Sequence, residues 1–211
     1  MPGLLYRAFT SLDHQRLSPN KRGPMSNTID LLKTRRSVKP MEMSGPGPSE
    51  SELETILTLG ARVPDHGKLA PWRFIVFEGD ARSRAGDIFA AIFKERNLAA
   101  TDDQVEVERK KFLHAPLVIA VVSRARQHVK IPLWEQELSA GASVMNIITA
   151  ANALGYVANW LTGWAAFDRD TLDALGLAPD EKLAGFVHIG RATRPVEDRD
   201  RPDLREIVTR F

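Results

Sequence analysis

The sequence of 211 residues contains no cysteine. That absence excludes a disulfide framework, a thiolate metal site and a cysteine nucleophile. A histidine-based zinc site is not indicated either, because the five histidines show neither an HExxH motif nor a paired spacing. They are His14, His66, His114, His128 and His188. Any redox chemistry in this chain must therefore come from a bound cofactor.

Several familiar sequence signatures are also missing. No apolar run is long enough to cross a bilayer, so we expect a soluble, cytoplasmic protein with no membrane partner. There is no G-x-S-x-G elbow, no G-x-x-x-x-G-K-[ST] loop and no dinucleotide fingerprint. Residues 45–48, Gly-Pro-Gly-Pro, are interpreted as a turn, because prolines lack the N–H groups that a phosphate loop presents. Any nucleotide must be held by charged side chains and a few backbone amides.

The small positive net charge of +2 comes from the N-terminus. Residues 1–24 contain four basic side chains and one acidic one, which leaves 25 basic and 26 acidic residues in the rest of the chain. The remainder is therefore not a basic nucleic-acid-binding module. We interpret residues 1–24 as a flexible basic extension. Met25 is the native start that we favour, with a short basic targeting peptide as the alternative.

Composition and patterning indicate one α+β domain over residues 25–211. Hydrophobic residues make up 43% and charged residues 27%, which is ordinary for a globular protein. Capping signals, such as Ser49 followed by Glu52, and apolar periodicity predict helices over about 27–36, 49–60, 80–97, 102–112, 135–154 and 168–175. Strands are expected over 72–77, 117–122, 157–161 and 185–189, and residues 41–48 are expected to be loop. The middle of the helix over 135–154, residues 140–153, is mostly small or apolar all round, which predicts a central helix buried on every side.

One short segment has the composition of a phosphate site. Arg35-Arg36-Ser37-Val38-Lys39 places three cations and a hydroxyl where a helix gives way to extended chain. A guanidinium matches phosphate oxygens in a bidentate way, and a lysine two residues after the serine points to the same side of an extended segment. The alternative is that these cations only complement the dipole at the C-terminus of a helix. The charges alone favour that alternative.

Together with three further segments, however, the sequence resembles the FMN-dependent nitroreductase family, in its short NAD(P)H nitroreductase branch. The resemblance extends from Asn27 to the C-terminus. Its marks, in order, are Arg35-Arg36-Ser37; Arg62-Val63-Pro64-Asp65-His66 before Pro71-Trp72; Trp134-Glu135-Gln136-Glu137 with Ser139-Ala140-Gly141; and Leu154-Gly155 before Asn159-Trp160-Leu161-Thr162-Gly163. It implies a three-layer sandwich in which a mixed or antiparallel sheet of four to five strands is flanked by helices. It also implies a homodimer with shared active sites.

The resemblance assigns flavin contacts to particular positions. Arg35, Arg36 and Ser37 would hold the phosphate and ribityl end of FMN, and Lys39 would lie near the pyrimidine edge of the flavin. There a positive charge would stabilise the negative charge of the reduced ring.

Further contacts are implied along the chain. Arg62 and His66 would contact FMN across the dimer interface. Trp160, Leu161 and Thr162 would line the isoalloxazine ring, and Arg191 lies near the position of a further phosphate contact. Residues 150–155 match a segment assigned to the nicotinamide nucleotide, although helix packing is the interpretation that we favour there. The sequence departs from many family members at Lys68 and Ala70, where those carry Asn and Gln.

The implied function is an oxidoreductase without a catalytic side chain. NADH or NADPH would reduce FMN and leave, and a small acceptor such as a nitroaromatic or a quinone would then take the electrons in a ping-pong cycle. Two alternatives stay open. One is other FMN chemistry in the same fold, such as dehalogenation or dehydrogenation, and the other is a non-catalytic flavin-binding protein.

Overall fold

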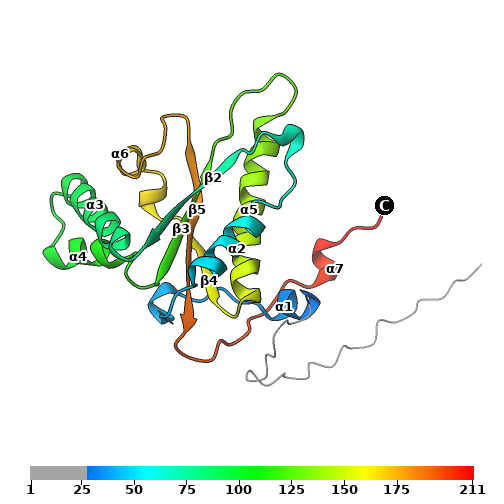
Figure 1. Ribbon diagram of the computed structural model, residues 1–211, viewed down its shortest axis with the longest axis horizontal. Helices are drawn as coiled ribbons and strands as arrows, with labels where there is room; N and C mark the ends of the chain where they lie inside the picture. The colour runs from blue at the N-terminus through cyan, green and yellow to red at the C-terminus, as the bar shows by residue number, and fades with distance from the viewer. Residues whose placement is uncertain (1–27) are drawn as a thin grey trace, which may run out of the picture.

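The structure is a computed structural model that describes residues 28–211, so the expected extension over residues 1–24 and the expected first residue of the helix over 27–36 lie outside the described residues. Figure 1 shows one sheet with helices on both of its faces. The elements in chain order are α1 (Thr28–Thr34), η1 (Pro40–Glu42), β1 (Met43–Ser44), α2 (Glu50–Gly60), η2 (His66–Lys68), β2 (Trp72–Glu78), α3 (Asp80–Arg96), α4 (Asp102–Lys110), β3 (Leu117–Ser123), α5 (Leu133–Ala153), β4 (Val157–Leu161), η3 (Trp164–Ala166), α6 (Arg169–Ala174), β5 (Lys182–Ala192) and α7 (Leu204–Ile207).

The sheet is built around β5. This strand pairs with β3, β4 and β1, and β3 pairs in turn with β2; every one of these pairings is antiparallel. Because β5 serves three partners, it extends beyond the expected residues 185–189 at both ends, from Lys182 opposite Ser123 to Ala192 opposite Met43. A sheet of five strands between helices confirms the expected α+β sandwich.

One face of the sheet is covered by α5 and α2 (Figure 1). The core there joins Ile119 and Val187 of the sheet to Val144 and Ile147 of α5 and Ile56 of α2. The expected central helix is confirmed, but burial on every side was wrong. Its core-facing residues are buried, whereas its other side is only half-buried, at Gly141, Ala142, Met145 and Asn146.

The opposite face is covered by α3 and α6, and α4 packs against α3 (Figure 1). β3 supplies its alternate side chains, Val118, Ala120 and Val122, to this second core, as the period of a strand requires. Aromatic rings fill the space, with Phe112 in edge contact with Phe89 and Phe186. The two faces together make the three layers.

Two local expectations meet different outcomes. Ser49 and Glu52 form a complete capping box at the start of α2, which confirms the expected helix start. The expected loop over residues 41–48 was wrong in part, since η1 and β1 lie within it. β1 consists of only two residues, Met43 and Ser44, which have no sequence pattern of their own. Their pairing with the C-terminal end of β5 alone defines β1 as a strand.

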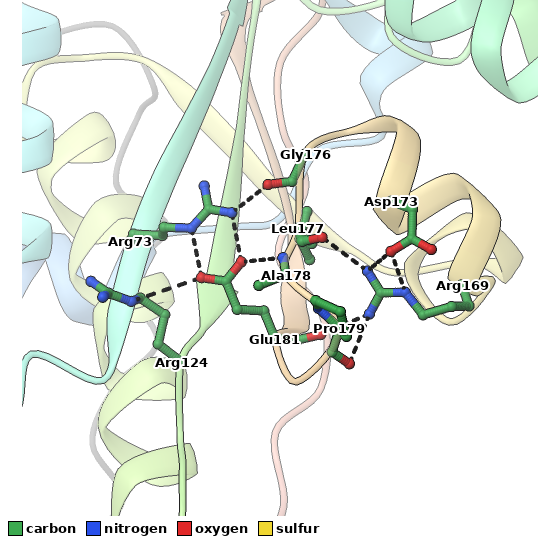
Figure 2. A network of polar contacts seen from close by, with 9 residues as sticks. All are labelled: Arg73, Arg124, Arg169, Asp173, Gly176, Leu177, Ala178, Pro179 and Glu181. Carbon is green, nitrogen blue, oxygen red and sulfur yellow. Dashed lines mark hydrogen bonds and ion pairs between the residues drawn. The ribbon is translucent and has the colours of Figure 1, made fainter.

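The turn that leads into β5 is fixed by two arginines (Figure 2). The guanidinium of Arg73 on β2 donates to both carboxylate oxygens of Glu181, at 2.8 and 2.6 Å, and the amide of Ala178 donates to the same carboxylate at 2.8 Å. Arg169 donates to the carbonyls of residues 177, 179 and 181. These bonds fix the chain at the start of β5, so the strand enters the sheet in one position.

No helix among residues 28–211 combines the length and the hydrophobicity that crossing a membrane requires.

Candidate functional site

Residues 35–39 run alongside β4. The segment forms an isolated parallel bridge between Ser37 and Ala158, and the amide of Val38 donates to the carbonyl of Ala158 at 3.3 Å. The side chain of Asn159 donates to the carbonyl of Val38 at 2.9 Å. The structure therefore brings the candidate phosphate segment beside the strand that ends in Trp160 and Leu161, although about 120 residues separate the two in sequence.

The side chains of this segment alternate. Val38 is buried against Met43 and Ala115, whereas Ser37 and Lys39 on either side of it are exposed. In extended chain, neighbouring side chains point in opposite directions, so Ser37 and Lys39 share the solvent side. Among residues 28–211 the ammonium group of Lys39 has no hydrogen-bond or ion-pair partner. It is available to a ligand on the same side as the serine hydroxyl.

Arg35 is the residue whose surroundings depart most from those of a surface arginine. One of its terminal nitrogens donates to the Ser37 hydroxyl at 3.3 Å, but its Nε is buried and has no partner among the described residues. Burial lowers the pKa of this guanidinium, and the charges of Arg201, Arg36 and Arg199 lower it further. A buried, unpaired donor next to like charges is unfavourable in the chain alone. An anion at this place would relieve both costs.

Arg36 is bound instead to the C-terminal segment. Its Nε donates to the carbonyl of Glu197 at 3.1 Å and lies 3.8 Å from the carboxylate of Asp198. This contact brings Arg199 and Arg201 close enough to Arg35 to affect its pKa. Sequence reasoning did not identify these two arginines, because they lie far along the chain in a segment without periodicity.

The end of β4 carries a second set of candidate flavin contacts, residues 160–162. Trp160 and Leu161 are each 41% exposed, and Thr162 is exposed as well. The indole Nε1 of Trp160 donates to the carbonyl of Ala184 at 2.9 Å, so the ring lies across β5. It crosses at Gly185, where a Cβ would stand 2.1 Å from the indole nitrogen. Glycine at this position therefore allows the ring to lie flat against the sheet.

A row of polar side chains on α5 holds the segment that follows α2. Ser143 donates to the carbonyl of Gly60 at 2.7 Å, and Ser139 donates to the carbonyl of Pro64 at 2.7 Å. The side-chain amide of Asn146 donates to the backbone carbonyls of residues 59 and 62. Positions 139, 143 and 146 lie on one face of a helix, so α5 positions the backbone of Arg62 while its side chain stays exposed.

His66 belongs to the next part of the same segment. Its Nδ1 lies 2.7 Å from Oε2 of Glu135, in the first turn of α5. The loop then turns sharply: Gly67, Lys68 and Ala70 have φ values of 71°, 55° and 46°. The carboxylate of Asp65 holds this turn by accepting from the amides of residues 69 and 70, both at 2.9 Å. Positive φ at non-glycine residues costs about 1–3 kcal/mol each and is concentrated at functional sites.

Arg191 lies apart from this group. Its Nη1 donates to the carbonyl of Gly155 at 3.1 Å, and its guanidinium stacks 3.9 Å from the centre of the Tyr156 ring. No contact joins it to Arg35 or Ser37 among the described residues. Residues 150–152 are buried against the core, which agrees with the packing interpretation of the segment 150–155.

Two cavities beside residues 65–71 are small. One of about 10 Å³ is lined by His66, Glu135 and Ser139, among others, and one of about 170 Å³ is lined by Ala70, Arg124 and neighbouring residues. Ligand pockets usually measure about 300–1,000 Å³. Neither cavity of the single chain would enclose a ligand as large as a nucleotide.

Comparisons with known proteins bear on the family and the fold of the chain. The model of the family described as "Nitroreductase family" matches residues 32–191. "Putative NAD(P)H nitroreductase YdjA" of Escherichia coli (strain K12) is 34% identical over 166 residues, which cover 78% of this chain and 87% of that protein. The structure of a nitroreductase-like protein from Bacillus cereus superposes with a TM-score of 0.78 at 20% identity, covering 90% of this chain and 99% of that one. A nitroreductase with bound FMN from Bacteroides fragilis gives 0.66 at 20% identity, with 88% and 99% covered.

Proposed function

Because the chain belongs to the nitroreductase family, we propose that it is an oxidoreductase that binds FMN and passes electrons from NADH or NADPH to a small acceptor. A relative carries NAD(P)H nitroreductase in its name, and a protein of the same fold holds FMN. The observation that carries the proposal is Arg35, a half-buried arginine whose buried Nε has no partner among the described residues and whose terminal nitrogen contacts the Ser37 hydroxyl.

Arg35, Arg36 and Ser37 would hold the FMN phosphate. Guanidinium groups and a hydroxyl are the donors that a phosphate dianion requires, and the like charges around Arg35 favour an anion among them. Asp198 pairs with both Arg36 and Arg201, whereas Arg35 has no ion-pair partner among residues 28–211. The donor set therefore fits the group.

Lys39 and the end of β4 would serve the flavin ring. FMN, when bound, supplies the atom that accepts hydride and passes electrons on. Lys39 shares the solvent side with Ser37, so its charge can stabilise a reduced, negatively charged ring. Trp160, Leu161 and Thr162 offer exposed apolar surface and backbone groups directly beside residues 37 and 38.

Arg62 and His66 would complete the site of a second copy of this chain. The two cavities beside residues 65–71 are smaller than a nucleotide pocket, so a flavin that reaches this segment needs further walls. The outer side of α5 exposes large apolar side chains one turn apart, Trp134 at 68% and Leu138 at 53%. Exposed apolar surface of this kind is typical of an interface. A homodimer would bury it and bring Arg62 and His66 to the partner's flavin. Arg191, which is held by Gly155 and Tyr156, stays a predicted contact.

The donor and the acceptor would use the same flavin in turn, in a ping-pong cycle, with nitroaromatics and quinones as the acceptors proposed. No side-chain nucleophile is needed, since this chain binds and orients the cofactor and sets the charge around it.

The phosphate assignment is tested by the double variant Arg35→Ala with Ser37→Ala. Each charge-assisted hydrogen bond contributes about 1.5–3 kcal/mol, so FMN affinity should fall by roughly 100-fold or more while the circular dichroism spectrum is retained. Lys33→Ala, which removes an exposed cation in the last turn of α1 just before Arg35, is the matched control and should keep its flavin. Equal flavin content in the double variant and the control, after loading and desalting, would refute the assignment.

A further inference from the structure

Glu135 contacts the candidate flavin-binding histidine from a different element. Its Oε2 lies 2.7 Å from Nδ1 of His66, and the two side chains are 40% and 63% exposed. A side-chain hydrogen bond so open to solvent adds little to folding stability. Its geometry, however, restricts what the imidazole can present to a ligand.

The contact determines which nitrogen of the ring carries the proton. An ionised carboxylate has no proton to donate, so Nδ1 of His66 must be the donor in this hydrogen bond. In the neutral ring the proton then sits on Nδ1, and Nε2 is left as an acceptor. Such an Nε2 accepts a hydrogen bond from an O–H or N–H donor, both of which FMN offers in its ribityl hydroxyls and its pyrimidine N–H.

Hydrogen bonds anchor the backbone on both sides of the contact between Glu135 and His66. Ser139, one turn along α5 from Glu135, accepts from the indole N–H of Trp72 at 3.2 Å and donates to the carbonyl of Pro64. The carboxylate of Asp65 fixes the turn that follows His66. Since both ends of the contact are anchored, Glu135 can hold the ring in one orientation.

We propose that Glu135 is a positioning residue which, through its hydrogen bond to Nδ1, fixes His66 in the tautomer that offers Nε2 to the flavin. This inference rests on the proposed function, because it deepens the role given there to His66. It assigns to the first turn of α5 a part in cofactor binding without any contact with the cofactor.

A double-mutant cycle on FMN affinity separates this role from a structural one. Glu135→Ala should weaken FMN binding by about tenfold, the usual effect of losing one hydrogen bond to a charged group. In the His66→Ala background the same change should alter the affinity by less than about twofold, since no ring is left to position. Glu135→Gln, whose amide oxygen can still accept from Nδ1, should keep most of the affinity. Equal losses from Glu135→Ala in both backgrounds would overturn the proposal.

The matched control lies two residues away on the same helix. The carboxylate of Glu137 is also half-exposed, but it forms an ion pair with Lys182 at 3.1 Å and has no contact with His66. Glu137→Ala should leave the FMN affinity of the full chain unchanged. A loss as large as that of Glu135→Ala would show that removing any carboxylate from this helix suffices, and the proposal would fail.

The tautomer is measured directly without FMN. Nitrogen-15 NMR of the imidazoles in the full chain, with the His66 signal assigned by its loss in His66→Ala, should show the Nδ1–H form in the wild type and a mixture in Glu135→Ala. An Nε2–H form in the wild type would overturn the inference even if FMN binds. Failure of the wild type to bind FMN would instead contradict the proposed function, while the NMR result would still judge the Glu135–His66 contact.

Discussion

His188 should make the fold sensitive to mild acid. It lies within β5 with 4% of its surface exposed, and its Nδ1 has no partner among the described residues. The ring of Phe112 packs against it edge-on at 5.6 Å. Burial lowers the pKa of this imidazole from 6.5 to about 4, with a smaller contribution from the charge of His114. The folded chain therefore resists a proton that the unfolded chain accepts.

The sign and size of the effect follow from linkage. Between pH 6.5 and about 4 the unfolded state binds more protons than the folded state, so stability falls as the pH falls. The loss begins near pH 6.5 and is complete at about pH 4, where it amounts to ~3 kcal/mol. From pH 7 to pH 5 it should be about 2 kcal/mol.

The variant His188→Leu replaces the titrating imidazole with an apolar side chain of similar size. Urea unfolding at pH 7 and pH 5 should show that the variant lacks this acid-dependent loss of about 2 kcal/mol. If the free energy of unfolding of His188→Leu fell as much as that of the wild type between pH 7 and pH 5, the buried neutral imidazole would not be the cause of the acid sensitivity.

Three further predictions concern the site and its support. Lys39→Met should retain FMN but lower its reduction potential, because a positive charge on the same side as Ser37 is lost; an unaltered potential in spectroelectrochemical titration would remove that role. Hydrogen bonds from Arg73 lower the pKa of Glu181 from 4.5 to about 2, so this carboxylate contributes ~3 kcal/mol above pH 4.5 and loses it as the pH falls toward 2. Urea unfolding at pH 7 should therefore show a large loss for Glu181→Gln and none for Asp180→Asn, and equal stability would contradict the network in Figure 2. Gly185→Ala should displace the Trp160 indole, because its Cβ would stand 2.1 Å from Nε1; unchanged tryptophan fluorescence would show that the ring does not lie there.

Much of the fold could be predicted because its signals are local. The capping box of Ser49 and Glu52 starts α2, and the apolar run in β3 is buried at every position. The elements that sequence reasoning missed depend on distant partners. β1 exists only where Met43 and Ser44 meet the end of β5, and the four residues of α7 have no apolar periodicity to reveal them.

The candidate site was less accessible to reasoning from residue types. The charges of residues 35–39 alone favoured a solvated helix end, and only the resemblance indicated a ligand. The contact of Ser37 with Ala158 and the approach of Arg199 and Arg201 to Arg35 are tertiary, and no spacing encodes them. Glu135 belonged to a recognised motif, but its bond to His66 spans 69 positions and becomes visible only once the fold is known.

Absorbance spectroscopy of the purified chain tests most directly whether it is an FMN-dependent oxidoreductase. The protein is incubated with FMN, desalted, and then mixed with NADH or NADPH without oxygen. We expect the flavin band to be retained after desalting and to bleach when the nicotinamide nucleotide is added. Loss of all flavin on desalting would contradict the proposed cofactor, and a retained band that neither nucleotide bleaches would contradict the proposed oxidoreductase.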